Sequence, residues 1–122
     1  MSQDGPAGQP GCLFCRIARG EIPAKILYDD ALVMAFRDIA PAAPAHVLVI
    51  PKQHVTSLAD VTPEHEPLLG RLLRVASEIA RTEGLAVAGY RVVANTGSDG
   101  GQSVHHLHLH VLGGRKLGWP PG

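Results

Sequence analysis

The sequence lacks the features that mark several large classes of protein. Its 122 residues include only 2 Phe, 2 Tyr and 1 Trp, too few for a surface that stacks successive nucleic-acid bases on aromatic rings. Lys+Arg and Asp+Glu number 11 each, so the formal charge is zero and no basic excess is present to hold a polyanion or an anionic lipid surface. We therefore expect neither a nucleic acid nor a membrane as partner.

Cysteines and long apolar runs are also scarce. Cys12 and Cys15 are the only 2 cysteines, and one pair cannot build a disulfide framework. No apolar run approaches the roughly 18 residues needed to cross a bilayer, and the first residues lack the basic start and apolar stretch of a signal peptide. These absences predict a protein of the reduced cytoplasm.

The residues that are present suffice for one folded domain. Hydrophobic residues make up 45% and charged residues 18% of the chain, a balance that excludes disorder over most of its length. Residues 1–11 (MSQDGPAGQPG) are small, polar and rich in Gly and Pro, so they are expected to form a disordered tail. The folded domain is expected at 12–122.

Hydrophobic periodicity and turn residues predict the order of the elements. Helices are expected at 12–19 and from Thr62 to about Thr82, where Thr62 is the cap and Pro63 takes the first helical position. Strands are expected at 26–28, 32–36, 46–50, 91–94 and 104–112. Because helices and strands do not alternate regularly, the predicted fold class is α+β with an antiparallel sheet.

A run of histidines carries the clearest chemical signal. Residues 105–110 read HHLHLH, and on a strand this order places His106, His108 and His110 on one face and His105 on the other. Three imidazoles on one face fit a metal site or nucleophilic catalysis by one of them. The loop at 95–103 (NTGSDGGQS) has the composition of a backbone cradle for phosphate, which favours a histidine nucleophile beside a bound phosphate.

The histidine run and several separate segments resemble the Hint branch of the histidine triad superfamily. The matching segments are 36–39 (FRDI), 45–52 (AHVLVIPK), 97–103 (GSDGGQS), 106–112 (HLHLHVL), 111–114 (VLGG) and 119–122 (WPPG). The resemblance implies a five-stranded antiparallel sheet with two helices per subunit, and a homodimer in which two such sheets join. It also implies a hydrolase of nucleoside 5′-monophosphoramidates that releases AMP or GMP from a P–N linked amine.

The resemblance assigns a role to individual side chains. His108 corresponds to the nucleophile that forms a nucleotidyl-histidine, and His46 and His106 would support it from behind. The nucleotide would be bound by Asp38 and Ile39 at the ribose and base, and at the phosphate or leaving group by Asn95, Gly101, Gln102, Ser103 and His110. An attacking imidazole must be neutral, so the second nitrogen of His108 should donate its proton to a carbonyl, while His110 or Ser103 would take part in protonating the amine. Since related transferases have Gln at position 110, His110 favours hydrolysis.

Cys12 and Cys15 suggest a second site. Some bacterial-type histidine triad proteins bind zinc through such a pair, the His of a Pro-Lys-x-His segment and the first triad His. Here the corresponding set is Cys12, Cys15, His54 and His106, which would form a closed structural site. Two buried thiols without a metal are the alternative. In either case catalysis requires no cofactor.

Other functions fit the same residues. The triad could hold a catalytic metal, the protein could bind nucleotides as a regulator without turnover, or it could hydrolyse dinucleoside polyphosphates. His105 is expected to lie at the surface or in packing, and His65 in solvent. Trp119 either reaches the partner's active site or anchors the C-terminus.

Overall fold

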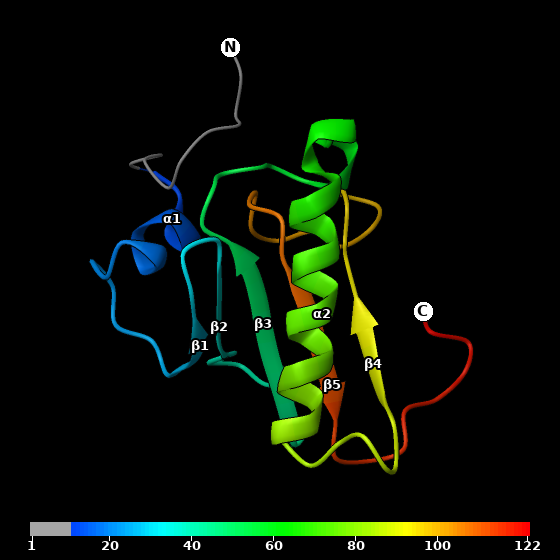
Figure 1. Cartoon of the computed structure of the whole chain (residues 1–122). Coiled ribbons are helices and arrows are strands. Elements are labelled where there is room, and N and C mark those ends of the chain that lie inside the picture. Colours follow the sequence, from blue (N-terminus) through cyan, green and yellow to red (C-terminus); the bar gives the residue numbers. More distant parts are fainter. Residues whose placement is uncertain (1–10) are drawn as a thin grey trace.

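A computed structural model describes residues 11–122, and these form one sheet with a helix on each face. The five strands are β1 (Ile26–Asp29), β2 (Val33–Arg37), β3 (Ala45–Pro51), β4 (Tyr90–Val93) and β5 (Leu109–Gly113). Their order across the sheet is β1-β2-β3-β5-β4, and every neighbouring pair is antiparallel. The predicted α+β class with a five-stranded antiparallel sheet and two helices is confirmed (Figure 1).

The long helix α2 (Glu66–Thr82) covers one face of the sheet (Figure 1). Its buried residues recur at the spacing of one helical face: Leu72, Val75, Ala76, Ile79 and Ala80. They pack against the side chains that alternate strand positions direct toward them, including Val33, Val47, Val49 and Val111. This aliphatic layer is the main core.

The short helix α1 (Leu13–Ala18) covers part of the opposite face. Phe14 and Ile17 pack there against Met34, Phe36, Leu48 and Ile50, the residues that alternate with those of the main core. A helix of six residues has little stability of its own. Its position therefore depends on this packing and on the contacts of Cys12 and Cys15 described below.

Two predicted boundaries differ from the structure by more than one residue. The helix expected after Thr62 starts as a 3₁₀ turn at Pro63–His65, and α2 begins at Glu66. The strand expected at 104–112 begins only at Leu109, so His106 and His108 precede it. The pairing of β3 with β5 stops near Pro51, because Pro51 has no N–H to donate and its carbonyl accepts a hydrogen bond from the ring of His106.

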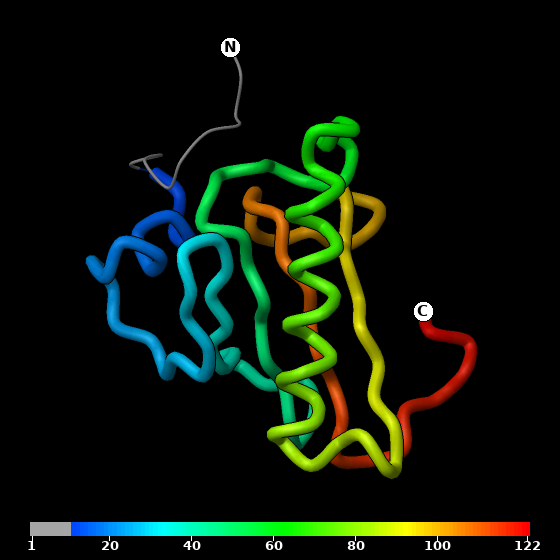
Figure 2. Tube along the Cα trace, in the orientation of Figure 1, coloured from blue at the N-terminus to red at the C-terminus, as the bar shows by residue number. Residues whose placement is uncertain are grey.

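The chain ends lie outside this core. The predicted disordered tail falls at residues 1–10 outside the described residues, and Gly11 is an exposed turn residue. Figure 2 shows the C-terminal segment returning beside β4, where Arg91 donates to the carbonyl of Gly118. The Trp119 side chain is 84% exposed, so it does not anchor the terminus on its own subunit. None of the helices between residues 11 and 122 has the length and apolar character needed to traverse a bilayer.

Candidate active site

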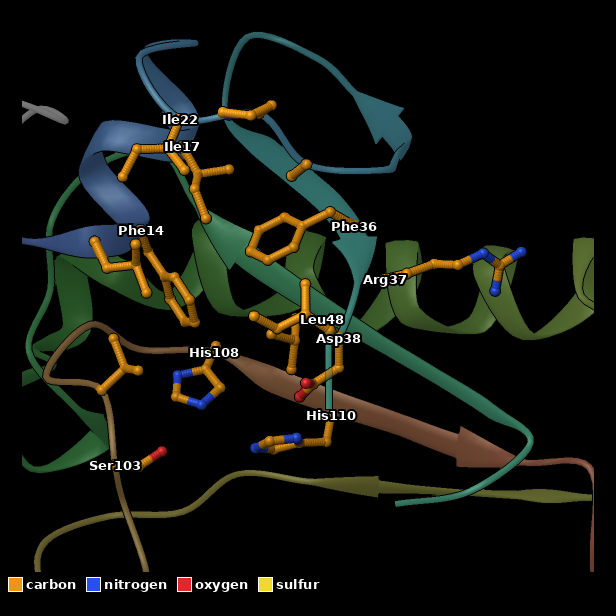
Figure 3. A pocket seen from close by; sticks show the side chains of 15 residues that line it. Phe14, Ile17, Ile22, Phe36, Arg37, Asp38, Leu48, Ser103, His108 and His110 are labelled. Carbon is orange, nitrogen blue, oxygen red and sulfur yellow. The ribbon is translucent and has the colours of Figure 1, made fainter. Parts of the chain in front are cut away.

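A pocket of about 280 Å³ opens between α1 and the ends of β2 and β5 (Figure 3). One wall is apolar and comes from α1 and the sheet, with Phe14, Ile17 and Phe36 at its centre. The other wall carries the polar residues Asp38, Ser103, His108 and His110. The pocket thus joins an apolar surface, which suits a flat ring, to a short row of polar groups suited to a phosphorylated sugar.

His108 is fixed with one nitrogen bound and the other available. Its ring is 4% exposed, and Nδ1 lies 2.7 Å from the carbonyl oxygen of His106. A carbonyl only accepts, so Nδ1 carries the proton and Nε2 keeps a lone pair. Burial lowers the pKa of His108, although the hydrogen bond to the His106 carbonyl and the charge of Asp38 act in the opposite direction. The ring of Phe14 stands edge-on at 5.1 Å between centroids and holds this orientation.

His110 takes its tautomer from a chain of hydrogen bonds. The backbone N–H of Ala42 donates to Nδ1 of His46 at 2.9 Å, so the proton of a neutral His46 is on Nε2. That nitrogen lies 2.8 Å from Nδ1 of His110 and 3.4 Å from a carboxylate oxygen of Asp38. His110 therefore accepts at Nδ1 and presents its own Nε2–H as a donor. Burial, followed by the neighbouring His108 and His46, lowers the pKa of His110 to about 4.

The contact of His46 refines the role expected for it. His46 bonds to His110 and Asp38, so any support that it gives to His108 is indirect. His106 does lie behind His108, because its carbonyl holds the His108 ring. The alternation of faces is also as predicted, since Leu107 and Leu109 enter the main core with α2 while His108 and His110 line the pocket.

Asp38 and Ile39 stand at the rim of the pocket. One carboxylate oxygen of Asp38 accepts the backbone N–H of Ala40 at 2.8 Å, which fixes the side chain. Its remaining acceptor capacity suits two adjacent hydroxyl groups. Ile39 is completely exposed and offers an apolar surface to a ring bound at the mouth.

The Gly-rich loop at 95–103, which its composition predicts to bind phosphate, uses three of its N–H groups in hydrogen bonds of its own. The N–H groups of Gly97, Gly101 and Gln102 all bond within the loop, to the Gln102 side chain, to Ser98 and to Gly97. The Gln102 amide also donates to the carbonyls of Thr56 and Val104, and Asn95 donates to the carbonyl of Gly100. Asn95, Gly101 and Gln102 therefore brace the loop and do not line the pocket, whereas Ser103 does.

Cys12, Cys15, His54 and His106 form a compact cluster at the N-terminal end of α1. Their ligand atoms all lie within 4.8 Å of one another. Nδ1 of His106 is 3.2 Å from Sγ of Cys12, 3.5 Å from Sγ of Cys15 and 3.2 Å from Nδ1 of His54. Tetrahedral zinc at ordinary bond lengths places two nitrogens roughly 3.3 Å apart and a nitrogen and a sulfur roughly 3.6 Å apart. The cluster therefore has the dimensions of a four-coordinate zinc site.

The outer contacts of His106 also fit such a site. Its Nε2 lies 2.8 Å from the carbonyl of Pro51, so Nε2 holds the proton and Nδ1 directs its lone pair at the cluster. Burial lowers the pKa of His106 to about 4, which keeps the ring neutral. The sequence did not indicate the Pro51 and Ala42 backbone groups, because backbone atoms carry no residue-type signal.

The three triad histidines do not converge on one point. Within the part of the chain that the structure describes, His106 belongs to the cysteine cluster and His110 to a group with Asp38 and His46, while His108 is in neither. In the second group, the proton on Nε2 of His46 occupies the position that a metal would need. The arrangement thus disfavours a metal held by the triad.

Comparison with known proteins gives consistent matches. The family model described as HIT domain matches residues 19–117. The chain is 53% identical over 106 residues to a purine nucleoside phosphoramidase of Escherichia coli, covering 87% of this chain and 89% of that protein. It is 58% identical over 110 residues to an uncharacterised HIT-like protein of Synechococcus elongatus, covering 90% and 96%. A crystal structure of a HIT family hydrolase from Legionella pneumophila superposes with a TM-score of 0.91 at 52% identity, covering 92% of this chain and all of that one.

Proposed function

Because this chain belongs to the HIT domain family, with relatives that are named hydrolases, we propose that it hydrolyses the P–N bond of purine nucleoside 5′-monophosphoramidates. A relative of 53% identity is named a purine nucleoside phosphoramidase. The observation that carries the proposal is the imidazole of His108, held by the His106 carbonyl so that a lone pair remains on the nitrogen used for attack. The product is AMP or GMP together with the released amine.

The substrate would lie along the pocket. Asp38 accepts the ribose hydroxyls, and the base rests between Ile39 and the apolar wall at Phe14 and Ile17. The phosphate then lies beside His108 and His110, where the Nε2–H of His110 donates to a phosphate oxygen. This placement requires no metal, because the charge that develops on the oxygens is met by hydrogen-bond donors.

The reaction proceeds in two steps that regenerate the enzyme. Nε2 of His108 attacks phosphorus, the P–N bond to the amine breaks, and the departing nitrogen takes a proton through Ser103 or His110. Water then attacks the phosphorus of the nucleotidyl-histidine and its proton returns to the group that protonated the amine, Ser103 or His110. The bond to Nε2 breaks, its electron pair returns to Nε2, and the nucleoside monophosphate leaves. His46 acts on His110 by fixing its tautomer, so it is a positioning residue.

The test uses an adenosine phosphoramidate with a fluorogenic amine. The wild-type protein is expected to turn it over, and His108→Asn is expected to lose activity by roughly 10³-fold to 10⁶-fold while still binding AMP. His65→Ala is the matched control, because His65 is a histidine at the start of the long helix, away from the pocket. Mass spectrometry after an alkaline quench should find the nucleotidyl group on the peptide that contains His108. A fully active His108→Asn protein contradicts the proposal, and AMP binding without turnover by the wild type indicates a regulator. Turnover of diadenosine polyphosphates in preference to the phosphoramidate indicates the polyphosphate hydrolase.

We also propose that Cys12, Cys15, His54 and His106 bind a structural zinc ion. Four protein ligands leave no open position, so the ion would stabilise the fold and take no part in the chemistry. It would tie α1 to the segment that carries His106, and so to the carbonyl that orients His108. The site needs both thiolates, which suits a reducing compartment such as the cytoplasm.

The proposal includes a homodimer joined at β4. This strand is an edge of the sheet, and its Tyr90 and Val92 are more than one-third exposed. An exposed edge strand with apolar side chains readily pairs with a second copy, which would join the two sheets as the family resemblance implies. Sedimentation analysis should then give twice the mass of one chain. Val92→Lys should reduce the measured mass to that of a single chain.

A further inference from the structure

A second groove, of about 440 Å³, begins where the nucleotide pocket ends. Leu13, Ser103 and Val104 line both spaces, so the groove and the pocket adjoin at these residues. Figure 3 shows Ser103 and Asp38 on opposite sides of the His108 ring. A substrate with its ribose at Asp38 and its phosphorus at His108 has Ser103 and the groove on the side away from the ribose, which is where its leaving amine would lie.

The groove has a distinct chemical character. Its remaining lining residues are Gly11, Cys12, His54 and His105, so within residues 11–122 neither an acid nor a lysine or arginine lines the groove. Cys12 and His54 are engaged in the cysteine–histidine cluster. His105 is exposed, and within residues 11–122 no hydrogen bond or ion pair occupies its ring. A ring N–H of His105 is thus the polar donor that the groove has available beyond Ser103.

We propose that this groove is the subsite for the amine leaving group, and that His105 selects amines that carry a carboxylate a few carbons from the nitrogen. A carboxylate accepts the N–H of His105 in a charge-assisted hydrogen bond. A cationic amine finds no carboxylate among the residues of 11–122 that line the groove. The distance between Ser103 and His105 sets the length of the amine. The two residues are two positions apart, so their Cα atoms are at most roughly 7 Å from each other. This inference rests on the proposed phosphoramidase function and names its substrate class.

The test compares two adenosine 5′-phosphoramidates that differ in one group. One contains 6-aminohexanoate and the other contains hexylamine, so chain length and the P–N bond are the same. We expect the wild-type kcat/KM to be about fivefold higher for the 6-aminohexanoate substrate than for the hexylamine substrate. The carboxylate gains one charge-assisted hydrogen bond, and this bond is weakened because it is partly exposed. His105→Ala should bring the ratio close to one, and His105→Asp should reverse it. His65→Ala, a histidine outside both spaces, should keep the wild-type ratio.

The possible outcomes separate the two proposals. If the wild type hydrolyses both amides and His105→Ala or His105→Asp keeps its ratio, the subsite is wrong and the phosphoramidase function stands. A wild-type ratio near one for two amides that are both hydrolysed also means that the subsite is wrong and the phosphoramidase function stands. If the wild type hydrolyses neither amide, the proposed function fails and the subsite with it. Zinc content and thermal unfolding of each variant show whether the neighbouring cluster and the fold are intact.

Discussion

Burial of His110 makes the stability of the protein depend on pH over a defined range. Its pKa falls from the ordinary 6.5 to about 4, first because of burial and then because of His108 and His46. The unfolded chain therefore binds this proton more readily than the folded chain does between those two values. Stability is lost as the pH falls from about 6.5 toward about 4, with no further loss from this group below that.

The magnitude follows from the shift. A full shift from 6.5 to 4 removes about 2 kcal/mol of unfolding free energy between pH 7 and pH 5, by the linkage relation. The side chain is only partly buried, so solvent screens part of the shift, and half of it removes about 1 kcal/mol. We therefore expect a loss of about 1 to 2 kcal/mol that belongs to His110 alone.

His110→Gln isolates this contribution. Glutamine does not titrate, and its side-chain oxygen can accept the hydrogen bond from His46 in place of Nδ1. Urea unfolding of both proteins at pH 7 and pH 5, at one protein concentration, shows how much unfolding free energy each protein loses between the two pH values. Titrating groups that do not interact with His110, such as His106, affect both proteins equally, and the measured difference includes the interaction of His110 with His108 and His46. His65→Gln, which makes the same replacement at a histidine outside the pocket, is the matched control for the substitution itself. If His110→Gln loses as much stability as the wild type between the two pH values, the reasoning about His110 is refuted.

Three further predictions concern the elements that hold the site. Asp30→Ala removes hydrogen bonds from Tyr28, Leu32, Val33 and Arg71, so urea unfolding at pH 7 should show a loss of about 2 to 4 kcal/mol; an unchanged midpoint would contradict this. Burial raises the pKa of Asp30, but hydrogen bonds from Tyr28 and Arg71 outweigh it and hold the pKa far below the ordinary range, so the loss should shrink only under strongly acidic conditions. Phe14→Leu removes edge-on contacts with His108 and Phe36 and should cost about 1 to 2 kcal/mol together with a lower kcat/KM; equal kinetics would mean that the ring does not orient the nucleophile. Metal analysis of tag-free protein should find one zinc per chain, and removing it with a chelator should lower Tm by several degrees; protein that holds no zinc would exclude the site.

Much of the site could be predicted from local sequence. The alternation at 105–110 by itself separates His106, His108 and His110 from Leu107 and Leu109, because strand geometry repeats every two residues. The same holds for β2 and β3, whose alternate residues enter the two layers of core. The need for a neutral nucleophile with its second nitrogen on a carbonyl is also a local chemical requirement, and Nδ1 of His108 meets it two residues away at the carbonyl of His106.

Tertiary structure decided where distant groups meet. Cys12 and His106 are 94 positions apart, and His46 and His110 are 64 apart, so only the packing of α1 and the register of β3 against β5 bring each pair together. Composition suggests that the loop at 95–103 binds phosphate, and the fold shows that the N–H groups of Gly97, Gly101 and Gln102 are already bonded within the loop. The sequence by itself determined which residues could do chemistry, because periodicity and residue type act over a few positions. Only the fold determined which of their atoms remain available, because hydrogen-bond satisfaction depends on neighbours that are distant in the chain.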